Sequence, residues 1–584
     1  MWHSLFRAYN HLPVTPSIPI PDMFLERTLA GWYNLGMMDQ LERDQVAGPA
    51  VSEDPADRPQ QVMKCGRISV LGVALVYLLV SLALLPGFLH AINADGISYI
   101  SIARRYLGGD WHGAINAYWG PLFSWLLVPF LALGLDALLA GKLLSIVIGL
   151  VTIPGLYVLA ARCHLSERLR MVVMVSLLPA LWLFTFQTLT PDFLIVCVLV
   201  WYFGVIFGPG YLNGIRAAVV VGVLGGLAYF SKAYGFYFFI AHLSLMTILL
   251  WLGAGVVAGR RRAVLRAYGV ALVVFALFSS GWIAALSVKY GHFIVSTSGC
   301  NNNALSALGA RDPLSLSCRS FRAPSDASAI SMWDDPSVLV VPNCTSFPSS
   351  VVMRHEGHAI MRNLMLMAGL IQRYFPLAAV IMVGSMVYCV RRRLGCLRLG
   401  GEALLLSTLL LYLAGYMLLF VEYRYLYICL ILLVLLGARV IRYLEAWGVL
   451  VGRWRGAACV ILALSIGVPS ALQTRVLHGK VEGVAVYELS MRLARQTRLV
   501  GNIASNKNWH QTLFIAYYLG LRYFDIKGAT PDDEILPALA RLGVNAYFVW
   551  EDTAEEHARF KNFPELTGGT IDGLRIYDLG GQSR

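Results

Sequence analysis

The chain of 584 residues is 57% hydrophobic and only 14% charged, and it carries a formal net charge of +13. So much apolar surface does not fit inside one soluble core, and the composition therefore indicates an α-helical polytopic membrane protein. Most of the basic residues lie in short loops between apolar segments, where they determine membrane topology, so the positive charge does not indicate a nucleic-acid partner.

The N-terminal 66 residues are polar and irregular and contain several prolines. No apolar core of a cleavable signal peptide lies near their start. We therefore expect residues 1–66 to form a cytoplasmic extension that precedes a transmembrane domain at residues 67–472.

Apolar segments predict about eleven spans in this transmembrane domain, with outer loops at residues 90–136 and 288–363. The first span, Ile68 to Leu89, follows two basic residues, and the positive-inside rule places such a flank in the cytoplasm. In the first outer loop, the apolar stretch from Pro121 to Leu135 is too short for a comfortable span. We expect it to be a re-entrant or interfacial helix around which other parts of the protein pack.

Three apolar blocks lie between loops that carry arginine on both sides, so each block must cross the membrane an even number of times. Each block is interrupted near its middle, and the interruption must lie at the outer surface. The charged residues at these outer turns are Asp192 in the block 171–208, Lys232 in the block 217–252, and Glu422 with Arg424 in the block 402–437.

Asp95 follows the first span and is predicted to lie on the same outer face. Taken alone, it is a good N-cap for the short amphipathic helix that follows, because its carboxylate can accept free backbone amides of the first turn. Snorkelling accounts for single ionisable residues at span ends. It accounts less well for three acids and two bases that converge from four turns, so the sequence predicts a polar site at this surface.

The second outer loop holds further candidates. His355, Glu356 and His358 are able to ligate a divalent metal, or they are simply solvated on a surface helix. Arg362 and Arg373 precede a span, where they bind a lipid phosphate or snorkel to head groups. Cys300, Cys318 and Cys344 share this loop, so one disulfide is predicted without a choice of pair.

From residue 473 to 584 the composition becomes that of a soluble domain, which the span count places outside the cytoplasm. Its strands and helices alternate and predict a small α/β domain. The expected strands are 498–505, 521–526, 545–550 and 574–579, and the expected helices are 509–519, 531–542 with Thr530 as N-cap, and 553–560.

Several short motifs, in this order and spacing, resemble the GT-C glycosyltransferases, in particular the branch with protein O-mannosyltransferases and the bacterial aminoarabinose and galacturonosyl transferases. The motifs are Asp95-Gly96-Ile97-Ser98-Tyr99, Tyr118-Trp119-Gly120-Pro121-Leu122, Thr190-Pro191-Asp192, the run from Gly226 to Lys232, and Glu422-Tyr423-Arg424-Tyr425-Leu426.

This resemblance implies an inverting transfer of a sugar from a polyprenyl-phosphate donor to an acceptor hydroxyl on the extracytoplasmic face. It assigns the role of general base to Asp95, and Asp192 would position the acceptor or share a divalent metal such as Mg²⁺ or Mn²⁺ with Asp95. The leaving phosphate needs cations. The candidates are Lys232 and Arg424, with Arg373 and Arg362 in reserve, and Tyr99, Glu422 and Tyr423 are candidate substrate contacts.

The implied partners are a lipid-linked sugar, a lipid, glycan or protein acceptor, and the bilayer, and the implied location is a bacterial inner membrane with the N-terminus in the cytoplasm and the C-terminus in the periplasm. Two departures separate the chain from its relatives: Gly96 stands where O-mannosyltransferases carry a second acid, and Gly120 lies near a lysine of the aminoarabinose transferases. The alternatives are a lipid-linked-sugar flippase, which would place charges at mid-membrane, and a non-catalytic assembly subunit.

Overall fold

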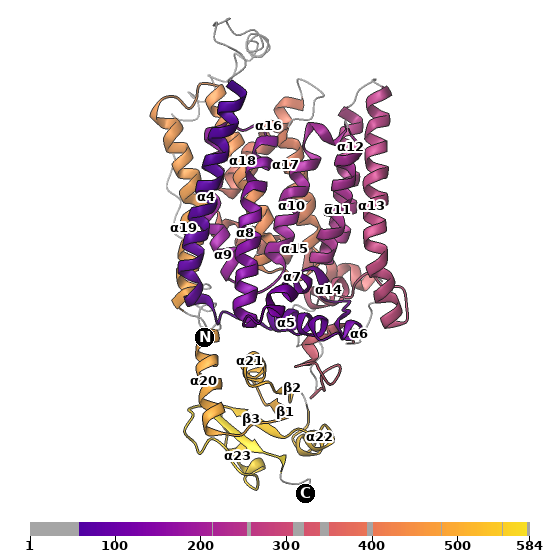
Figure 1. Ribbon diagram of the computed structural model, residues 1–584, viewed down its shortest axis with the longest axis vertical. Coiled ribbons are helices and arrows are strands. Elements are labelled where there is room, and N and C mark those ends of the chain that lie inside the picture. The colour runs from indigo at the N-terminus through magenta and orange to yellow at the C-terminus, as the bar shows by residue number, and fades with distance from the viewer. Residues whose placement is uncertain are drawn as a thin grey trace, which may run out of the picture. The chain divides into compact units, whose positions relative to one another are not determined.

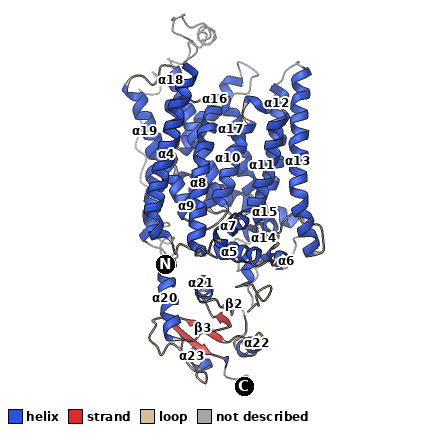
Figure 2. Ribbon diagram, in the orientation of Figure 1, coloured by secondary structure: helices blue, strands red, loops and turns tan. Residues whose placement is uncertain are grey.

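The computed structural model describes residues 58–212, 214–253, 258–307, 321–338, 350–393, 401–479, 482–528, 530–551 and 553–580. This part of the chain is a helical bundle followed by a small sheet near the C-terminus (Figure 2). The long helices are α4 (Arg58–Phe88), α8 (Ala137–Arg162), α9 (Glu167–Phe186), α12 (Tyr234–Gly253), α13 (Ala258–Tyr290), α18 (Tyr427–Ala446) and α19 (Arg453–Gly479).

Among the described residues, seven helices are long and apolar enough to cross a membrane. An eighth candidate is α15 (Ser350–Tyr374) with α16 (Ala378–Arg393), which are bent by 108° at a short break. The shorter apolar helices α10 (Asp192–Ile206), α11 (Ile215–Ser231) and α17 (Gly401–Tyr416) occupy the remaining segments that were predicted to span. The chain is therefore an integral, multi-pass membrane protein.

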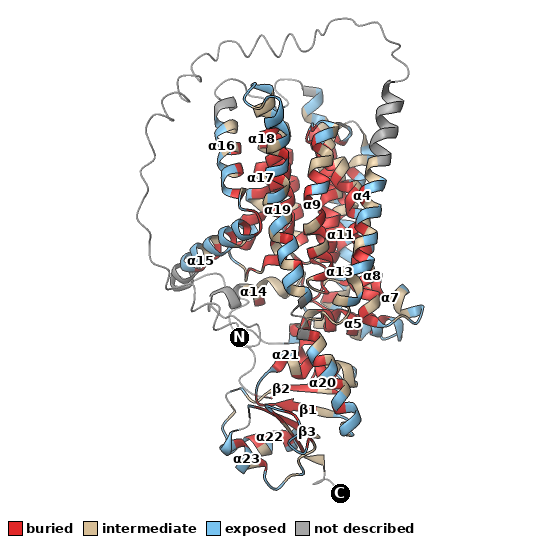
Figure 3. Ribbon diagram, turned by 90° about the vertical axis from the view of Figure 1, so that its left-hand side faces the viewer, coloured by how far each residue is buried: buried red, intermediate tan, exposed pale blue. Residues whose placement is uncertain are grey.

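Burial distinguishes inner from peripheral helices (Figure 3). Of the residues in the apolar stretch of α18, 83% are buried, whereas the share is 17% in α4 and 22% in α13. Leucines such as Leu71 and Leu79 are more than half exposed on α4. Exposed leucine on a helix that spans a bilayer contacts lipid tails, so α4 and α13 lie at the lipid boundary and α18 lies at the centre.

The three predicted outer turns are confirmed as breaks between helices. Residues 187–191 separate α9 from α10, and Pro191 is the residue before the first turn of α10. Lys232 is extended between α11 and α12, with φ −157° and ψ 136°. The third break ends in the 3₁₀ helix η6 (Tyr423–Leu426), which leads into α18.

Short helices lie across one end of the bundle, which we call the α5 end (Figure 1). They are α5 (Ala94–Leu107), α6 (Trp111–Ala114), α7 (Pro121–Ala132) and α14 (Ser298–Ala307). Helix α7 confirms the short helix predicted in the first outer loop. The prediction that Asp95 is an N-cap is wrong: Asn93 is the N-cap, and Asp95 lies in the first turn of α5.

The sheet also lies at the α5 end and has the strand order β2-β1-β3-β4 (Figure 1). Strands β1 and β2 are parallel, β1 and β3 are parallel, and β3 and β4 are antiparallel. The bounds are β1 Asn502–Ser505, β2 Arg522–Ile526, β3 Ala546–Trp550, β4 Leu574–Asp578, α20 Glu482–Gln496, α21 Trp509–Leu519, α22 Ile535–Arg541 and α23 Ala554–Phe560.

The predicted alternation of strands and helices is confirmed, with one correction. Thr530 does not cap a helix, because residues 531–534 form a turn and α22 begins at Ile535 after Glu534. Lys527 contributes to this turn, since it accepts the amide of Thr530 on its carbonyl and lies 3.7 Å from Asp532.

The segment of residues 321–338, which we call the Trp333 segment, connects the sheet with α5. It includes the 3₁₀ helices η4 (Met332–Asp334) and η5 (Pro336–Val338). On the sheet side, the amide of Tyr523 donates to the carbonyl of Ile330 at 2.7 Å, along the edge of β2. On the α5 side, the hydroxyl of Ser101 donates to Asp334 at 2.6 Å.

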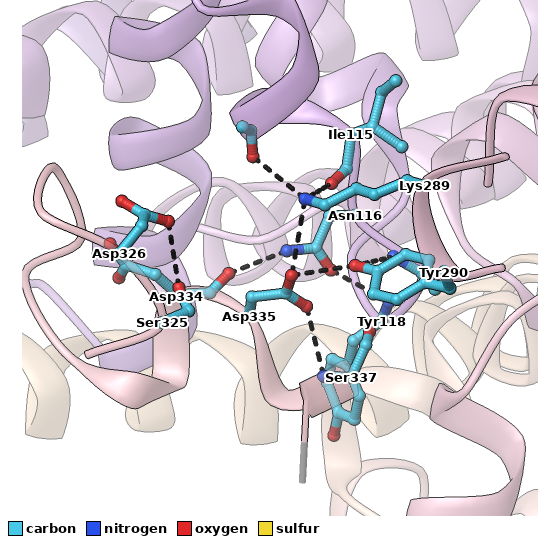
Figure 4. A network of polar contacts seen from close by, with 12 residues as sticks. Ile115, Asn116, Tyr118, Lys289, Tyr290, Ser325, Asp326, Asp334, Asp335 and Ser337 are labelled. Carbon is cyan, nitrogen blue, oxygen red and sulfur yellow. Dashed lines mark hydrogen bonds and ion pairs between the residues drawn. The ribbon is translucent and has the colours of Figure 1, made fainter. Parts of the chain in front are cut away.

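Further polar contacts hold the Trp333 segment on the loop that follows α6 and on the end of α13 (Figure 4). The side chain of Asn116 donates to the carbonyl of Asp334 at 2.8 Å, and Tyr290 donates to Asp335 at 2.8 Å. Burial raises the pKa of Asp334 to about 6. Cys300, in α14, is disulfide-bonded as predicted, and its partner lies outside the described residues.

Candidate active site

Arg424 is the centre of a buried ionic cluster at the α5 end. One of its terminal nitrogens lies 2.6 Å from Oδ2 of Asp95, and its Nε lies 2.7 Å from Oε2 of Glu422. The same Nε is 3.5 Å from Oδ2 of Asp192. One guanidinium therefore contacts three carboxylates, and only 9% of the Arg424 side chain is exposed.

Lys232 is the second cation of the cluster. Its ammonium donates to Oδ1 of Asp192 at 2.6 Å and lies 3.4 Å from the centroid of the Tyr425 ring, a cation–π geometry. The hydroxyl of Thr190 donates to Oδ2 of the same carboxylate at 2.8 Å. Asp192 thus contacts Lys232, Thr190 and Arg424, and its side chain is only 5% exposed.

Two glycines allow these elements to approach each other. A Cβ on Gly96 would come within 3.0 Å of the backbone oxygen of Leu189, and a Cβ on Gly120 would come within 2.6 Å of the backbone oxygen of Ser231. Backbone atoms cannot yield as a flexible side chain does. Gly96 and Gly120, at which the chain departs from the families it resembles, therefore permit the close approach of α5 to residue 189 and of the loop before α7 to residue 231.

Asp95 has a second partner that the sequence does not indicate. The indole nitrogen of Trp333 donates to Oδ1 of Asp95 at 3.1 Å, while Arg424 contacts Oδ2. The backbone carbonyl of Trp333 accepts from Ser98 at 2.9 Å and from the indole of Trp119 at 3.1 Å. The carboxylate is therefore held at both oxygens, and Asp95 lines the cavity described next.

The cluster faces a cavity of about 560 Å³. Its polar part contains Asp95, Asp192, Lys232, Glu422 and Arg424. Its aromatic part contains Tyr99, Tyr118, Trp119, Trp333 and Tyr425. Its apolar wall comes from α12, α17 and the residues just after α17, and includes Tyr237, Phe238, Leu411 and Leu418. A charged group with an apolar extension fits such a cavity, because its two ends need different surroundings.

The pKa values of several groups in the cluster are displaced, and burial is the cause for two of them. Burial raises the pKa of Glu422 above its ordinary value, against the opposing effect of Arg424. Burial also lowers the pKa of Lys232, against the effect of Asp192. Displaced pKa values in a cavity are typical of functional sites, although structural ion pairs produce them too.

The structure brings together six of the predicted site residues in this cavity, namely Asp95, Asp192, Lys232, Arg424, Tyr99 and Glu422. It separates the others. Tyr423 points away and stacks on Tyr374 with ring centroids 3.5 Å apart. Arg362 and Arg373 are exposed on α15, outside the residues that line the cavity.

The residues present do not fit a divalent metal. Asp95 and Asp192 are the expected ligands, but Lys232 and Arg424 already supply positive charge to both carboxylates. In the described part of the chain, no group of three or more His, Cys, Asp or Glu residues is able to hold a metal ion. His358 is exposed on α15, and the side chains of His355 and Glu356 lie outside the described residues.

No family model and no curated protein matches this chain. Among the solved structures that are similar to it are two of oligosaccharyltransferases and one of ArnT. The apo oligosaccharyltransferase of Archaeoglobus fulgidus superposes with a TM-score of 0.54 at 12% identity, over 84% of this chain and 71% of that one. The archaeal oligosaccharyltransferase AglB from the same organism, in complex with an inhibitory peptide and a dolichol-phosphate, gives 0.52 at 12%, over 84% and 70%. ArnT from Cupriavidus metallidurans, bound to undecaprenyl phosphate, gives 0.45 at 16%, over 87% and 98%.

Identities this low concern the fold alone. The fold of this chain is similar to that of the two oligosaccharyltransferase structures, in agreement with the GT-C fold that its motifs predicted. Within that fold, the first loop after α4 supplies Asp95 and the later turns supply Asp192, Lys232 and Arg424 to one cavity.

Proposed function

We propose that the chain is a glycosyltransferase that moves a sugar from a polyprenyl-phosphate donor to a hydroxyl of a lipid, glycan or protein acceptor. The observation that carries this proposal is the pair of cations Lys232 and Arg424, with side chains 23% and 9% exposed, which share a cavity with Asp95 and an apolar wall. This combination matches a donor that has a phosphate, a sugar and an isoprenoid tail.

The cations act on the leaving group. When the bond between the anomeric carbon and the phosphate oxygen breaks, its electron pair stays on the phosphate. Lys232 and Arg424 stabilise this developing charge, and they do so more strongly than in water because the cluster is largely shielded from solvent. Lys232 is held in position before the donor binds, because its ammonium donates to Asp192 and Thr190 in turn donates to the other oxygen of Asp192.

Asp95 acts on the acceptor. Its carboxylate takes the proton of the acceptor hydroxyl while the acceptor oxygen forms a bond to the anomeric carbon on the face opposite the phosphate, which inverts the configuration. Trp333 holds the base during this step through its hydrogen bond to Oδ1. Asp192, with both oxygens engaged by Lys232 and Thr190, positions the cluster.

A strain that lacks the chain tests the proposal. Mass analysis of its lipid-linked sugars is expected to show that one polyprenyl-phosphate sugar accumulates, and this species identifies the donor. The purified protein is then expected to transfer that sugar and to release polyprenyl phosphate. An unchanged lipid pool, together with purified protein that transfers no sugar from any accumulated carrier, would overturn the proposal.

Trp333→Phe is expected to lower kcat about tenfold to a hundredfold, because one hydrogen bond to a charged group is lost while the aromatic ring remains. The KM for the donor is expected to change little, since Trp333 does not contact the cations. Trp509→Phe is the matched control: its ring centroid lies 6.4 Å from that of Trp333, and it belongs to α21. Equal losses in both variants would indicate a general packing defect.

We further propose that the α5 end faces the periplasm, together with the domain of residues 473–584. A cysteine introduced at Leu133, which is 80% exposed after α7, is expected to react with a membrane-impermeant maleimide in intact cells. A cysteine at Arg260, exposed at the start of α13, is expected to react only after permeabilisation. The opposite pattern would reverse the proposed orientation.

A further inference from the structure

This inference rests on the proposed function and concerns how the donor gains access to Arg424. The proposed function assigns Arg424 to the donor phosphate, yet three carboxylates already contact it. An incoming phosphate must therefore displace at least one of them.

Charge makes this displacement more demanding. Among the described residues, the ion pairs of Asp95, Asp192 and Glu422 involve two cations, Lys232 and Arg424. A phosphodiester adds a further negative charge to a site of low exposure, where unbalanced charge is costly. A proton taken up by one carboxylate would remove this excess.

Glu422 is the carboxylate best placed to yield. Without Arg424, Asp192 keeps Lys232 and Thr190, and Asp95 keeps Trp333. Among the described residues, Glu422 has an ion pair only with Arg424. Its side chain is 37% exposed, compared with 15% for Asp95 and 5% for Asp192, so solvent protons reach it most readily.

We propose that Glu422 is a proton-coupled gate: it takes up one proton from solvent when the donor phosphodiester binds, and it thereby releases the guanidinium of Arg424 to the phosphate. No other bond is made or broken in this step. The proton that the acceptor loses later goes to Asp95, so the two carboxylates have separate roles.

The surroundings of Glu422 agree with this gate. The titratable and charged groups that face it are Arg424 and Tyr425 from η6, Asp95 from α5, Asp192 from α10, Lys232 after α11, Tyr118 before α7 and Tyr427 from α18. Burial and the two nearby aspartates raise its pKa, and Arg424 lowers it. A phosphate that draws Arg424 away removes the largest effect that lowers this pKa, so binding and protonation favour each other.

The test is binding of farnesyl methyl phosphate, a phosphodiester with one negative charge across the working pH range, to the full chain in detergent micelles. Above the pKa of free Glu422, the Kd is expected to rise about tenfold per pH unit, because one proton is bound together with the ligand. In Glu422→Gln, the Kd is expected to stay low and independent of pH, while the exposed control Glu551→Gln behaves as the wild type.

Calorimetry in buffers of different ionisation enthalpy measures the proton directly. About one proton is expected per phosphodiester bound in the wild type at pH values above this pKa, and none in Glu422→Gln. Tight binding by the wild type without proton uptake would overturn the gate and leave the proposed function intact, even if Glu422→Gln does not fold. A phosphodiester that fails to bind at any pH would instead contradict the proposed donor itself.

Discussion

Asp95→Asn is expected to lower kcat for sugar transfer about a thousandfold, within the range of 10²–10⁴ found for general-base catalysis. The amide has the size of the carboxylate and still accepts from Trp333, but it cannot take the proton of the acceptor. The KM for the donor is not expected to rise, because the substitution frees Arg424 from one negative charge. The measurement is the steady-state rate of transfer from the identified donor.

Asp110→Asn is the matched control for this variant. Asp110 is also an acid of the loop between α4 and α8, but it is exposed and its side chain only accepts the amide of Gly113 at the start of α6. It is expected to keep nearly full activity. If Asp95→Asn, correctly folded, transfers sugar as fast as Asp110→Asn, Asp95 is not the base.

The meeting of Asp95, Asp192, Lys232 and Arg424 could be predicted from the sequence because membrane topology restricts where residues lie. Arginine-bearing loops on both sides of an apolar block force its middle to the opposite surface, and a charged residue in that middle must lie there. Whether these residues lie on one face of the membrane then depends only on the number of membrane crossings between arginine-bearing loops, which must be even. This count needs no knowledge of how the helices pack.

The number of membrane crossings does not determine which side chains of this surface contact each other. Arg424 binds three carboxylates, and Trp333 reaches Asp95 across 238 positions of the chain. Trp333 lies in a polar loop with no periodic pattern, so no local signal marks it as a ligand of the base. Its place depends on tertiary contacts of the Trp333 segment with α5 and with β2, which a single sequence does not reveal.

The preference of an acid for the N-cap position does not determine the role of Asp95. An acid at the start of a helix is a favourable N-cap, and the sequence predicted that role. In the structure the helix begins one residue after Asn93, so the Asp95 side chain is directed to Arg424 and Trp333 instead. The carboxylate contacts Arg424 and Trp333 in place of a cap, whose contribution is about 1 kcal/mol.

Arg424→Gln is expected to abolish measurable transfer and also to lower the stability of the protein by about 3–5 kcal/mol, the usual cost of removing one partner of a buried ion pair. The activity is lost because the leaving phosphate loses its main cation. The stability falls because Asp95, Asp192 and Glu422 then face each other with Lys232 as their one remaining cation in the cluster. Thermal unfolding in detergent measures the second effect.

The double variant Arg424→Gln with Glu422→Gln separates the two effects. Removing the charge of Glu422 relieves part of the repulsion, so the double variant is expected to unfold at a higher temperature than Arg424→Gln alone, while transfer stays absent. Lys507→Gln is the control, because its ion pair with Glu551 is exposed and its loss is expected to leave stability unchanged. A single variant as stable as the wild type would mean that Arg424 does not balance the three carboxylates, and the charge argument for the Glu422 gate would then fail with it.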